Sequence, residues 1–94
     1  MPADTVGLYR IRDPNRPGLV YVGQGRIRMR LKAHLAKALL PEHPQARWFG
    51  LPDLDCSWTT GHGWLEHQRL ELENDLIAAH VHEHGAPPSA QFLG

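Results

Sequence analysis

The sequence predicts an α/β domain (an α+β sandwich) in which a small sheet and two long helices share one core. Three observations predict this fold class. Three short segments are rich in alternating, β-prone residues, and two longer segments carry a helical repeat of apolar residues. The chain has only 94 residues, which suffices for one hydrophobic core. We therefore expect a single domain that spans residues 1–94.

Residues 5–12 and 19–23 are the first two predicted strands. Both segments alternate and are rich in valine, isoleucine and tyrosine, which favour extended chain. The segment between them, residues 13–18, is dense in proline, asparagine and glycine, which are typical of turns. The two strands should therefore form a hairpin with a long loop.

Residues 26–40 are predicted to form the first long helix, which Pro41 ends. One face of this helix should be apolar, and its members are Ile27, Leu31, Leu35, Ala38 and Leu39. Arg30, His34 and Lys37 form a stripe along the edge of that face. The connector 44–52 carries two aromatic anchors, Trp48 and Phe49, and could hold a short helix.

Residues 54–60 are the third predicted strand, with Leu54, Cys56 and Trp58 on one face. Residues 61–63 should turn the chain into a second long helix over 64–84. A glycine, Gly85, caps that helix, and residues 86–94 form an extended tail.

Glu73 is the most informative residue of the second long helix. A helical projection places it inside the apolar arc, with Arg69 and His80 beside it. A carboxylate in such a position must be paired, bind a metal or line a cavity. An ion pair with Arg69, four residues earlier, and a side chain that reaches the sheet edge remain open alternatives.

The net charge of zero conceals two oppositely charged halves. Residues 1–48 hold nine Lys or Arg and three Asp or Glu. Residues 49–94 hold one Lys or Arg and seven Asp or Glu. A basic surface opposite an acidic one would suit a nucleic-acid partner. The alternative is that the two halves neutralise each other in the fold.

The expected cellular location follows from features that the sequence lacks. No apolar run is long enough to span a membrane, so we expect no membrane association. The N-terminus lacks the pattern of a signal peptide. The single cysteine, Cys56, cannot form an internal disulfide, and we expect a cytoplasmic protein.

Four short motifs together resemble the GIY-YIG nuclease superfamily. They are Gly7-Leu8-Tyr9, Tyr21-Val22-Gly23, Arg30-Leu31 with His34, and Leu72-Glu73-Asn74. Their order and spacing agree with the family over nearly the whole chain. The closest resemblance is to the nuclease domain of the excision-repair incision subunit.

The resemblance implies a three-stranded antiparallel sheet with helices on both sides, and metal-dependent hydrolysis of phosphodiesters. It implies that Glu73 anchors one divalent metal, Mg²⁺ or Mn²⁺, and that Tyr9 is a general base or orients the water. Arg30 would steady the phosphate, while Tyr21 and His34 would support the other groups. We expect Tyr9 and Tyr21 to face the same side of the hairpin as Glu73 and Arg30 and to form one cleft with them.

The chemistry needs these residue types for physical reasons. Negative charge gathers on the phosphate oxygens in the transition state, and the planar fork of arginine matches two of them. Mg²⁺ takes few protein ligands and keeps several waters, so one glutamate can suffice. A free tyrosine has a pKa near 10, so nearby cations would have to lower it before Tyr9 could act as a base.

The sequence departs from the family at two positions. Gln24 stands where the family often has a lysine after its second motif, and His34 or Arg26 could compensate. Gln91 stands in the tail, where the family usually ends with an asparagine. The residues expected to contact nucleic acid are Gln24, Arg26, Arg28, Lys37 and Gln91.

Two other functional classes remain open. The chain could be a catalytically weak or inactive module that keeps the fold and binds nucleic acid. A zinc-dependent interaction domain is a weaker option: His80 and His84 share a helix face, but Cys56 and His62 are distant in sequence. We expect DNA as the partner. Cleavage could be loosely specific, could depend on a single-stranded or branched shape, or could be targeted by a protein partner.

Overall fold

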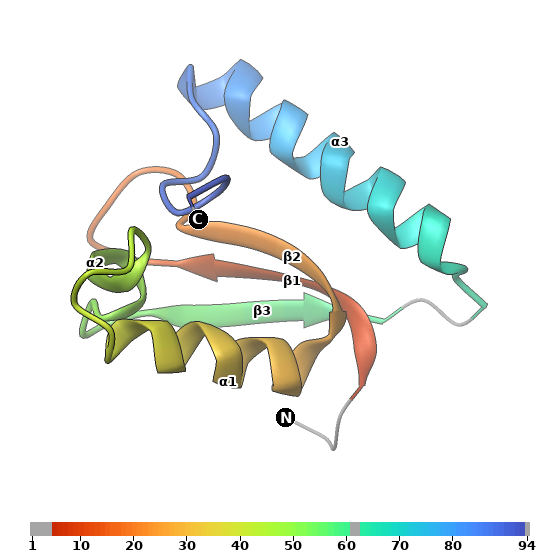
Figure 1. Ribbon diagram of the computed structural model, residues 1–94. Coiled ribbons are helices and arrows are strands. Elements are labelled where there is room, and N and C mark those ends of the chain that lie inside the picture. Colours follow the sequence, from red (N-terminus) through yellow and green to blue (C-terminus); the bar gives the residue numbers. More distant parts are fainter. Residues whose placement is uncertain (1–4, 61–62, 94) are drawn as a thin grey trace.

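The computed structural model describes residues 5–60 and 63–93, which form a three-stranded antiparallel sheet with a long helix on each side (Figure 1). This arrangement confirms the predicted fold class. The strands are β1 (Val6–Arg12), β2 (Tyr21–Arg26) and β3 (Asp55–Thr59), and the helices are α1 (Ile27–Ala38), α2 (Ala46–Phe49) and α3 (Glu66–His84). Most of the predicted turn at 61–63 lies outside the described residues.

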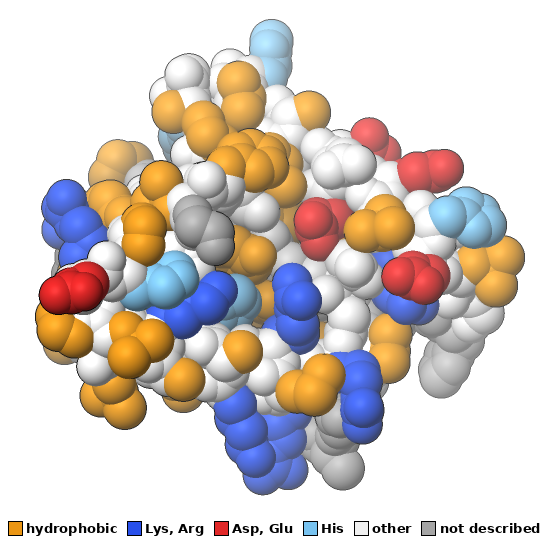
Figure 2. All heavy atoms as spheres, in the orientation of Figure 1, with side chains coloured by type: hydrophobic (Ala, Val, Ile, Leu, Met, Phe, Trp, Pro, Cys, Tyr) orange, Lys and Arg blue, Asp and Glu red, His pale blue; other side chains and the backbone are white. Residues whose placement is uncertain are grey.

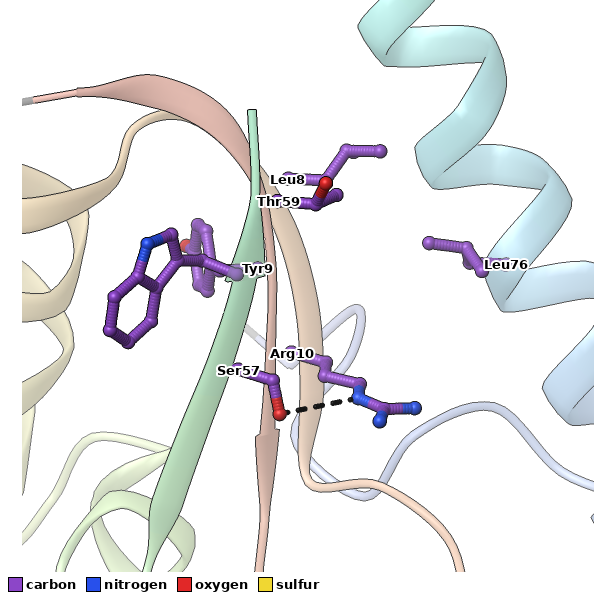
Figure 3. A pocket seen from close by; sticks show the side chains of 7 residues that line it. Leu8, Tyr9, Arg10, Ser57, Thr59 and Leu76 are labelled. Atoms are coloured by element: carbon purple, nitrogen blue, oxygen red, sulfur yellow. Dashed lines mark hydrogen bonds between the residues drawn. The ribbon is translucent and has the colours of Figure 1, made fainter. Parts of the chain in front are cut away.

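The order of the strands is β2-β1-β3, so the first strand is central and the other two are edges. Tyr9 lies opposite Gly23 on one side and opposite Trp58 on the other. Side chains alternate between the two faces of a sheet. Figure 3 shows the result: Tyr9 points to one side, while Leu8, Arg10, Ser57 and Thr59 point to the side of α3.

The second strand is displaced from its predicted position. We expected a strand over 19–23, but β2 runs from Tyr21 to Arg26 and continues directly into α1. The backbone at residues 19 and 20 instead accepts hydrogen bonds from the tail, at 3.0 Å from Ser89 N to Leu19 O and 2.8 Å from Ala90 N to Val20 O. The tail thus pairs with the segment that we expected to be a strand.

The buried face of α1 differs from the predicted apolar face. Ile27 is buried, and Leu31 and Ala38 are half-buried, but Leu35 and Leu39 are 61% and 81% exposed. His34 is buried in their place, with 4% of its surface exposed. The helix is rotated toward His34 because this side chain is hydrogen-bonded and stacked in the core, as described below.

The packed face of α3 is centred on Ile77 and His80, which are buried, and includes the half-buried Arg69, Leu72 and Glu73. Other apolar residues of this helix are exposed, although its helical repeat predicts apolar faces on both sides of Glu73, and these are Leu65, Leu70, Leu76 and Val81. The reason is the course of the helix, which packs mainly along β2 and leaves β3 uncovered (Figure 1).

The tail returns beside β2 rather than extending away from the fold (Figure 1). Gly85 ends α3 in a left-handed conformation, as predicted. The His80 ring fixes this corner, because its Nε2 accepts the Leu19 N–H at 2.9 Å and its Nδ1 lies 2.7 Å from the Ala86 carbonyl oxygen. Within the described part of the chain, no helix combines the length and the apolarity needed to cross a membrane.

Candidate active site

The Tyr9 ring lies against the backbone of Gly23 on the neighbouring strand. A Cβ at position 23 would overlap the Cζ and hydroxyl oxygen of Tyr9. Only glycine leaves the space that the phenol occupies. The pairing of the two motifs, Gly7-Leu8-Tyr9 and Tyr21-Val22-Gly23, therefore has a steric cause: the glycine of the second motif accommodates the tyrosine of the first.

Three aromatic side chains hold the phenol in place. Tyr21 lies on the same sheet face as Tyr9, with ring centroids 6.2 Å apart, and this confirms the expectation that the two tyrosines face the same side. His34 packs against Tyr21 at 4.6 Å, and Phe49 of α2 stacks on His34 at 4.5 Å. The phenol is thus positioned by packing rather than left to rotate in solvent.

His34 is hydrogen-bonded to Tyr9 and is neutral at pH 7. Its Nε2 lies 2.7 Å from the Tyr9 hydroxyl oxygen. Burial, with smaller contributions from the charges of Lys37 and Arg30, lowers the pKa of His34 to about 4. Its Nδ1 is buried and has no hydrogen-bond partner among the described residues.

The unpaired nitrogen favours one tautomer of His34. A buried N–H without an acceptor is rarer than a buried acceptor without a donor. We therefore assign the proton to Nε2, which donates to the Tyr9 oxygen. In this tautomer, the hydroxyl hydrogen of Tyr9 remains available for a group that binds at the site.

Arg30 extends from the first turns of α1 toward the two tyrosines. Interaction with the Tyr9 phenol is the main cause that raises the pKa of Arg30. Its side chain passes Gly25, whose φ of 118° favours glycine and at which an added Cβ would lie 4.0 Å from Arg30 Cγ.

Tyr9 is protonated in the free protein at neutral pH. Burial raises the pKa of Tyr9 to about 12, and interaction with Arg30 only partly opposes this effect. The charges of Tyr21 and Glu73 also raise it. A phenol with this pKa can orient a ligand through its hydrogen bonds, but it is a poor base without a further cation.

Glu73 is half-buried, and its carboxylate has neither a hydrogen bond nor an ion pair with any described residue. Burial raises the pKa of Glu73, and the positive charge of Arg30 opposes the rise. The predicted alternative of an ion pair with Arg69 is wrong for the described residues. Arg69 donates instead to Gln24 Oε1 and to the Trp64 carbonyl oxygen, both at 3.3 Å.

The site joins two layers of the fold. Tyr9, Tyr21 and His34 lie between the sheet and α1, whereas Glu73 is on α3, which packs on the opposite side of the sheet (Figures 1 and 3). The helix that carries Glu73 thus packs on the other side of the sheet from the two tyrosines, and one cleft shared by Tyr9, Tyr21, Arg30 and Glu73 stays a prediction. The charge of Glu73 acts on Tyr9 and Arg30 across β2, an edge strand.

The predicted nucleic-acid contacts fall into two groups. Arg26 and Arg28 are exposed where β2 leads into α1, and Gln24 is half-exposed on the α3 side. Figure 2 shows blue Lys and Arg side chains over α1 and red Asp and Glu side chains over α3. This face therefore presents basic and acidic groups side by side around the site.

Lys37 and Gln91 have contacts inside the fold. Lys37 Nζ donates to Gln45 Oε1 at 2.8 Å, and Gln45 Nε2 donates to the Ala90 carbonyl oxygen at 2.8 Å. The Gln91 amide bonds the backbone of Val22 twice, at 3.0 and 3.1 Å. Gln91 is only 7% exposed, so the observed role of its amide is to hold the tail on β2.

The structure does not favour the zinc alternative. Both ring nitrogens of His80 are used within the fold. Burial raises the pKa of the Cys56 thiol, which disfavours the thiolate that zinc needs. Among residues 5–60 and 63–93, no three His, Cys, Asp or Glu side chains gather in a way that could hold a metal.

Sequence reasoning missed two residues that organise the site. Gln45 is 4% exposed and connects α1 to the tail, but a glutamine in a loop carries no pattern that would reveal this role. The spacing along the helix indicates only Glu73 as a partner for Arg69. Its actual acceptor, Gln24, is 45 residues away in sequence, and no local spacing connects the two.

Comparison of the chain with models of known protein families, with curated proteins and with solved structures finds no match in any of the three. The function proposed below therefore follows from the residues of this chain.

Proposed function

We propose that the protein is a metal-dependent endonuclease that hydrolyses phosphodiester bonds in DNA. The observation that supports this proposal is the arrangement around β2. Two stacked phenols, a neutral histidine and an arginine interact on one side, and a carboxylate without a protein partner acts on them from the other. Such a combination suits hydrolysis of a phosphodiester, because a fixed cation and a bound metal would both stabilise the negative charge on the phosphate oxygens.

Glu73 is the residue that would hold Mg²⁺ or Mn²⁺. Its carboxylate is half-buried and has no partner among the described residues, and a bound cation would compensate this charge. One protein carboxylate is compatible with Mg²⁺, which keeps several waters. When bound, the metal would supply Lewis-acid stabilisation of charge on the phosphate.

The other residues bind and orient. Arg30 would bind the phosphate oxygens through its planar fork. Tyr9 would orient the attacking water through its hydroxyl, and it would act as a base only if cations at the site lower its pKa from about 12. His34 and Tyr21 hold the phenol in position through the hydrogen bond and the stacked rings.

The second candidate is a nucleic-acid-binding module of the same fold with weak or no catalysis. The raised pKa of Tyr9 favours this candidate, because a protonated phenol cannot accept a proton from water. The neutral Gln24 next to the site favours it as well. For either candidate we propose a cytoplasmic location and, where specificity is required, a protein partner that supplies targeting.

The test is cleavage of DNA by the wild type and the Glu73→Gln variant. The assay uses single-stranded, duplex and branched DNA, with RNA for comparison, in Mg²⁺ and in EDTA. We expect cleavage by the wild type in Mg²⁺ only, and none by the variant, because the amide removes the charge that would hold the metal. Glu71→Gln is the matched control, since Glu71 is exposed on the same helix.

Three outcomes separate the two candidates. Loss of cleavage in Glu73→Gln with retained activity in Glu71→Gln supports the nuclease. Binding of DNA without cleavage in any condition favours the binding module. Wild-type rates in a folded Glu73→Gln variant contradict the role of Glu73 in the nuclease.

A further inference from the structure

Arg69 is a half-buried cation that has only neutral partners among the described residues. Its Nε donates to Gln24 Oε1 and its Nη1 donates to the Trp64 carbonyl oxygen, both at 3.3 Å. These distances lie at the long end for N–H···O hydrogen bonds. A guanidinium that is partly removed from water without a carboxylate partner retains the capacity to bind an anion.

Arg69 and Glu73 are neighbours that do not pair. They are four residues apart on the same half-buried face of α3, a spacing at which opposite charges usually attract each other. Gln24 and Trp64 instead hold the guanidinium toward the N-terminal end of the helix. The structure therefore presents a cation and an anion side by side that do not pair: Arg69 bonds only neutral groups among the described residues, and Glu73 makes no ion pair there but feels the charge of Arg30.

The two arginines of the site lie on opposite sides of β2. Arg30 interacts with Tyr9 on the α1 side. Arg69 bonds Gln24, whose side chain points to the α3 side because it follows Gly23 by one residue. Glu73 acts electrostatically on Arg30 and is one helical turn from Arg69. Successive phosphates of a nucleic-acid strand could therefore contact first the region of Arg30 and Glu73 and then Arg69.

We propose that Arg69, held by Gln24, contacts a phosphate adjacent to the one that is cleaved, so that the nucleic-acid strand crosses the edge of β2 from α1 to α3. This proposal rests on the proposed function, which supplies both nucleic acid as the ligand and the cleaved phosphate next to which Arg69 binds. Arg69 then determines binding of the strand and its register, whereas Arg30 acts on the phosphate that reacts.

Binding and chemistry should respond differently to substitution of the two arginines. Arg69→Gln should raise the Kd and KM about tenfold, the loss expected for one charge-assisted hydrogen bond, and leave kcat nearly unchanged. It should also reduce the slope of log K against log salt by about 0.7, as expected for one phosphate contact on a single strand. Arg30→Gln should lower kcat.

The experiment measures binding of a short fluorescein-labelled single-stranded DNA by fluorescence anisotropy. Binding is recorded in EDTA, where no cleavage is expected, at several salt concentrations. Cleavage kinetics in Mg²⁺ are recorded separately for the same proteins. Thermal unfolding of each variant shows whether the loss of the two long hydrogen bonds has affected the fold.

Two further variants control for charge and for position. Arg69→Lys keeps the positive charge, and we expect it to restore most of the salt slope. Arg10→Gln removes an exposed arginine from the same side of the sheet, where Arg10 makes only a 3.5 Å hydrogen bond to Ser57 (Figure 3). We expect Arg10→Gln to bind DNA like the wild type.

Each outcome bears on one of the two proposals. A higher Kd and a smaller salt slope in Arg69→Gln, but not in Arg10→Gln, support the role of Arg69. This holds even if no protein cleaves DNA and the nuclease proposal fails. Cleavage by the wild type, with unchanged Kd, KM and salt slope in Arg69→Gln, overturns the role of Arg69 and leaves the nuclease proposal intact. Absence of both binding in EDTA and cleavage in Mg²⁺ by the wild type overturns both proposals.

Discussion

At the scale of single residues, contacts between side chains and backbone determine the chemistry of Tyr9. Gly23 leaves the space for the phenol, and His34 bonds the hydroxyl at 2.7 Å. Burial raises the pKa of Tyr9 to about 12 and lowers that of His34 to about 4. Both groups are therefore uncharged at neutral pH; Arg30 interacts with both of them, and Lys37 also acts on His34.

Tyr9→Phe should abolish or strongly reduce cleavage with little change in stability. The variant keeps the ring against Gly23 and removes only the hydroxyl that can orient a water or bear a proton. It leaves His34 without its partner, so we expect a loss of about 1 kcal/mol in the free energy of unfolding. Urea denaturation and cleavage kinetics measure the two effects.

Tyr21→Phe is the matched comparison for this prediction. Tyr21 stacks on Tyr9 and packs on His34 and Phe49 through its ring, which phenylalanine preserves. We expect a smaller loss of activity than in Tyr9→Phe. Full activity in Tyr9→Phe would contradict the proposed mechanism and favour the binding module.

At the scale of elements, the tail and the helices protect and shape the edge of β2. Gln91 bonds Val22 where a further strand would pair, and Ser89 and Ala90 bond the backbone before it. An uncovered strand edge is prone to pairing with other chains. The tail therefore keeps this edge closed beside the residues that form the site.

Gln91→Leu should destabilise the protein. The substitution removes the donor and the acceptor that pair with Val22 and leaves both backbone groups in a buried position. We expect a loss of about 1–3 kcal/mol in the free energy of unfolding, the cost of unsatisfied buried polar groups. Chemical denaturation measures it, with Ser89→Ala at an exposed tail position as the control. Unchanged stability together with weaker DNA binding would instead support a direct contact of Gln91 with nucleic acid.

At the scale of the whole molecule, the two charged halves of the sequence remain largely separate on the face that Figure 2 shows. The Arg12–Asp55 ion pair, at 3.0 Å, joins the two halves on the surface. Basic residues gather over α1 and acidic residues over α3, with the site between them. His34 lies in this same region, and its lowered pKa predicts that the stability of the molecule depends on pH.

The protein should lose stability as the pH falls from 6.5 to about 4. In this window the unfolded chain protonates His34 at its ordinary pKa of 6.5, whereas the folded protein resists until about 4. Protons therefore favour the unfolded state, and the free energy of unfolding should fall by on the order of 2–3 kcal/mol over this window. Unfolding by urea at several pH values measures the slope.

His34→Gln isolates this contribution, because an amide does not titrate and can still bond Tyr9. We expect a flatter dependence of stability on pH between 6.5 and 4 in this variant. His67→Gln, a substitution at an exposed histidine, should follow the wild type. Parallel curves for the wild type and His34→Gln would show that the burial of His34 does not determine acid stability.

The candidate site was predictable from sequence to the extent that it depends on local pattern. The strands that carry Tyr9 and Tyr21 follow from β-prone alternation, and their common face follows from the register. The position of Glu73 on the packed face of α3 follows from helical periodicity. The tautomer of His34, the acceptor of Arg69 and the place of Gln91 could not be predicted, because each depends on a contact between distant segments.

The sequence by itself determined the fold class, the approximate extent of the helices, and the turns between strands, because the spacing of apolar residues and the backbone preferences of glycine and proline act locally. The tertiary structure decided which faces are buried. Leu35 and Leu39 are exposed and His34 is buried, because packing against Tyr9, Tyr21 and Phe49 outweighs the apolar pattern of the isolated helix. The electrostatics of the site were decided at the same level, since burial shifts the pKa values of Tyr9, His34 and Glu73 only after distant segments have come together.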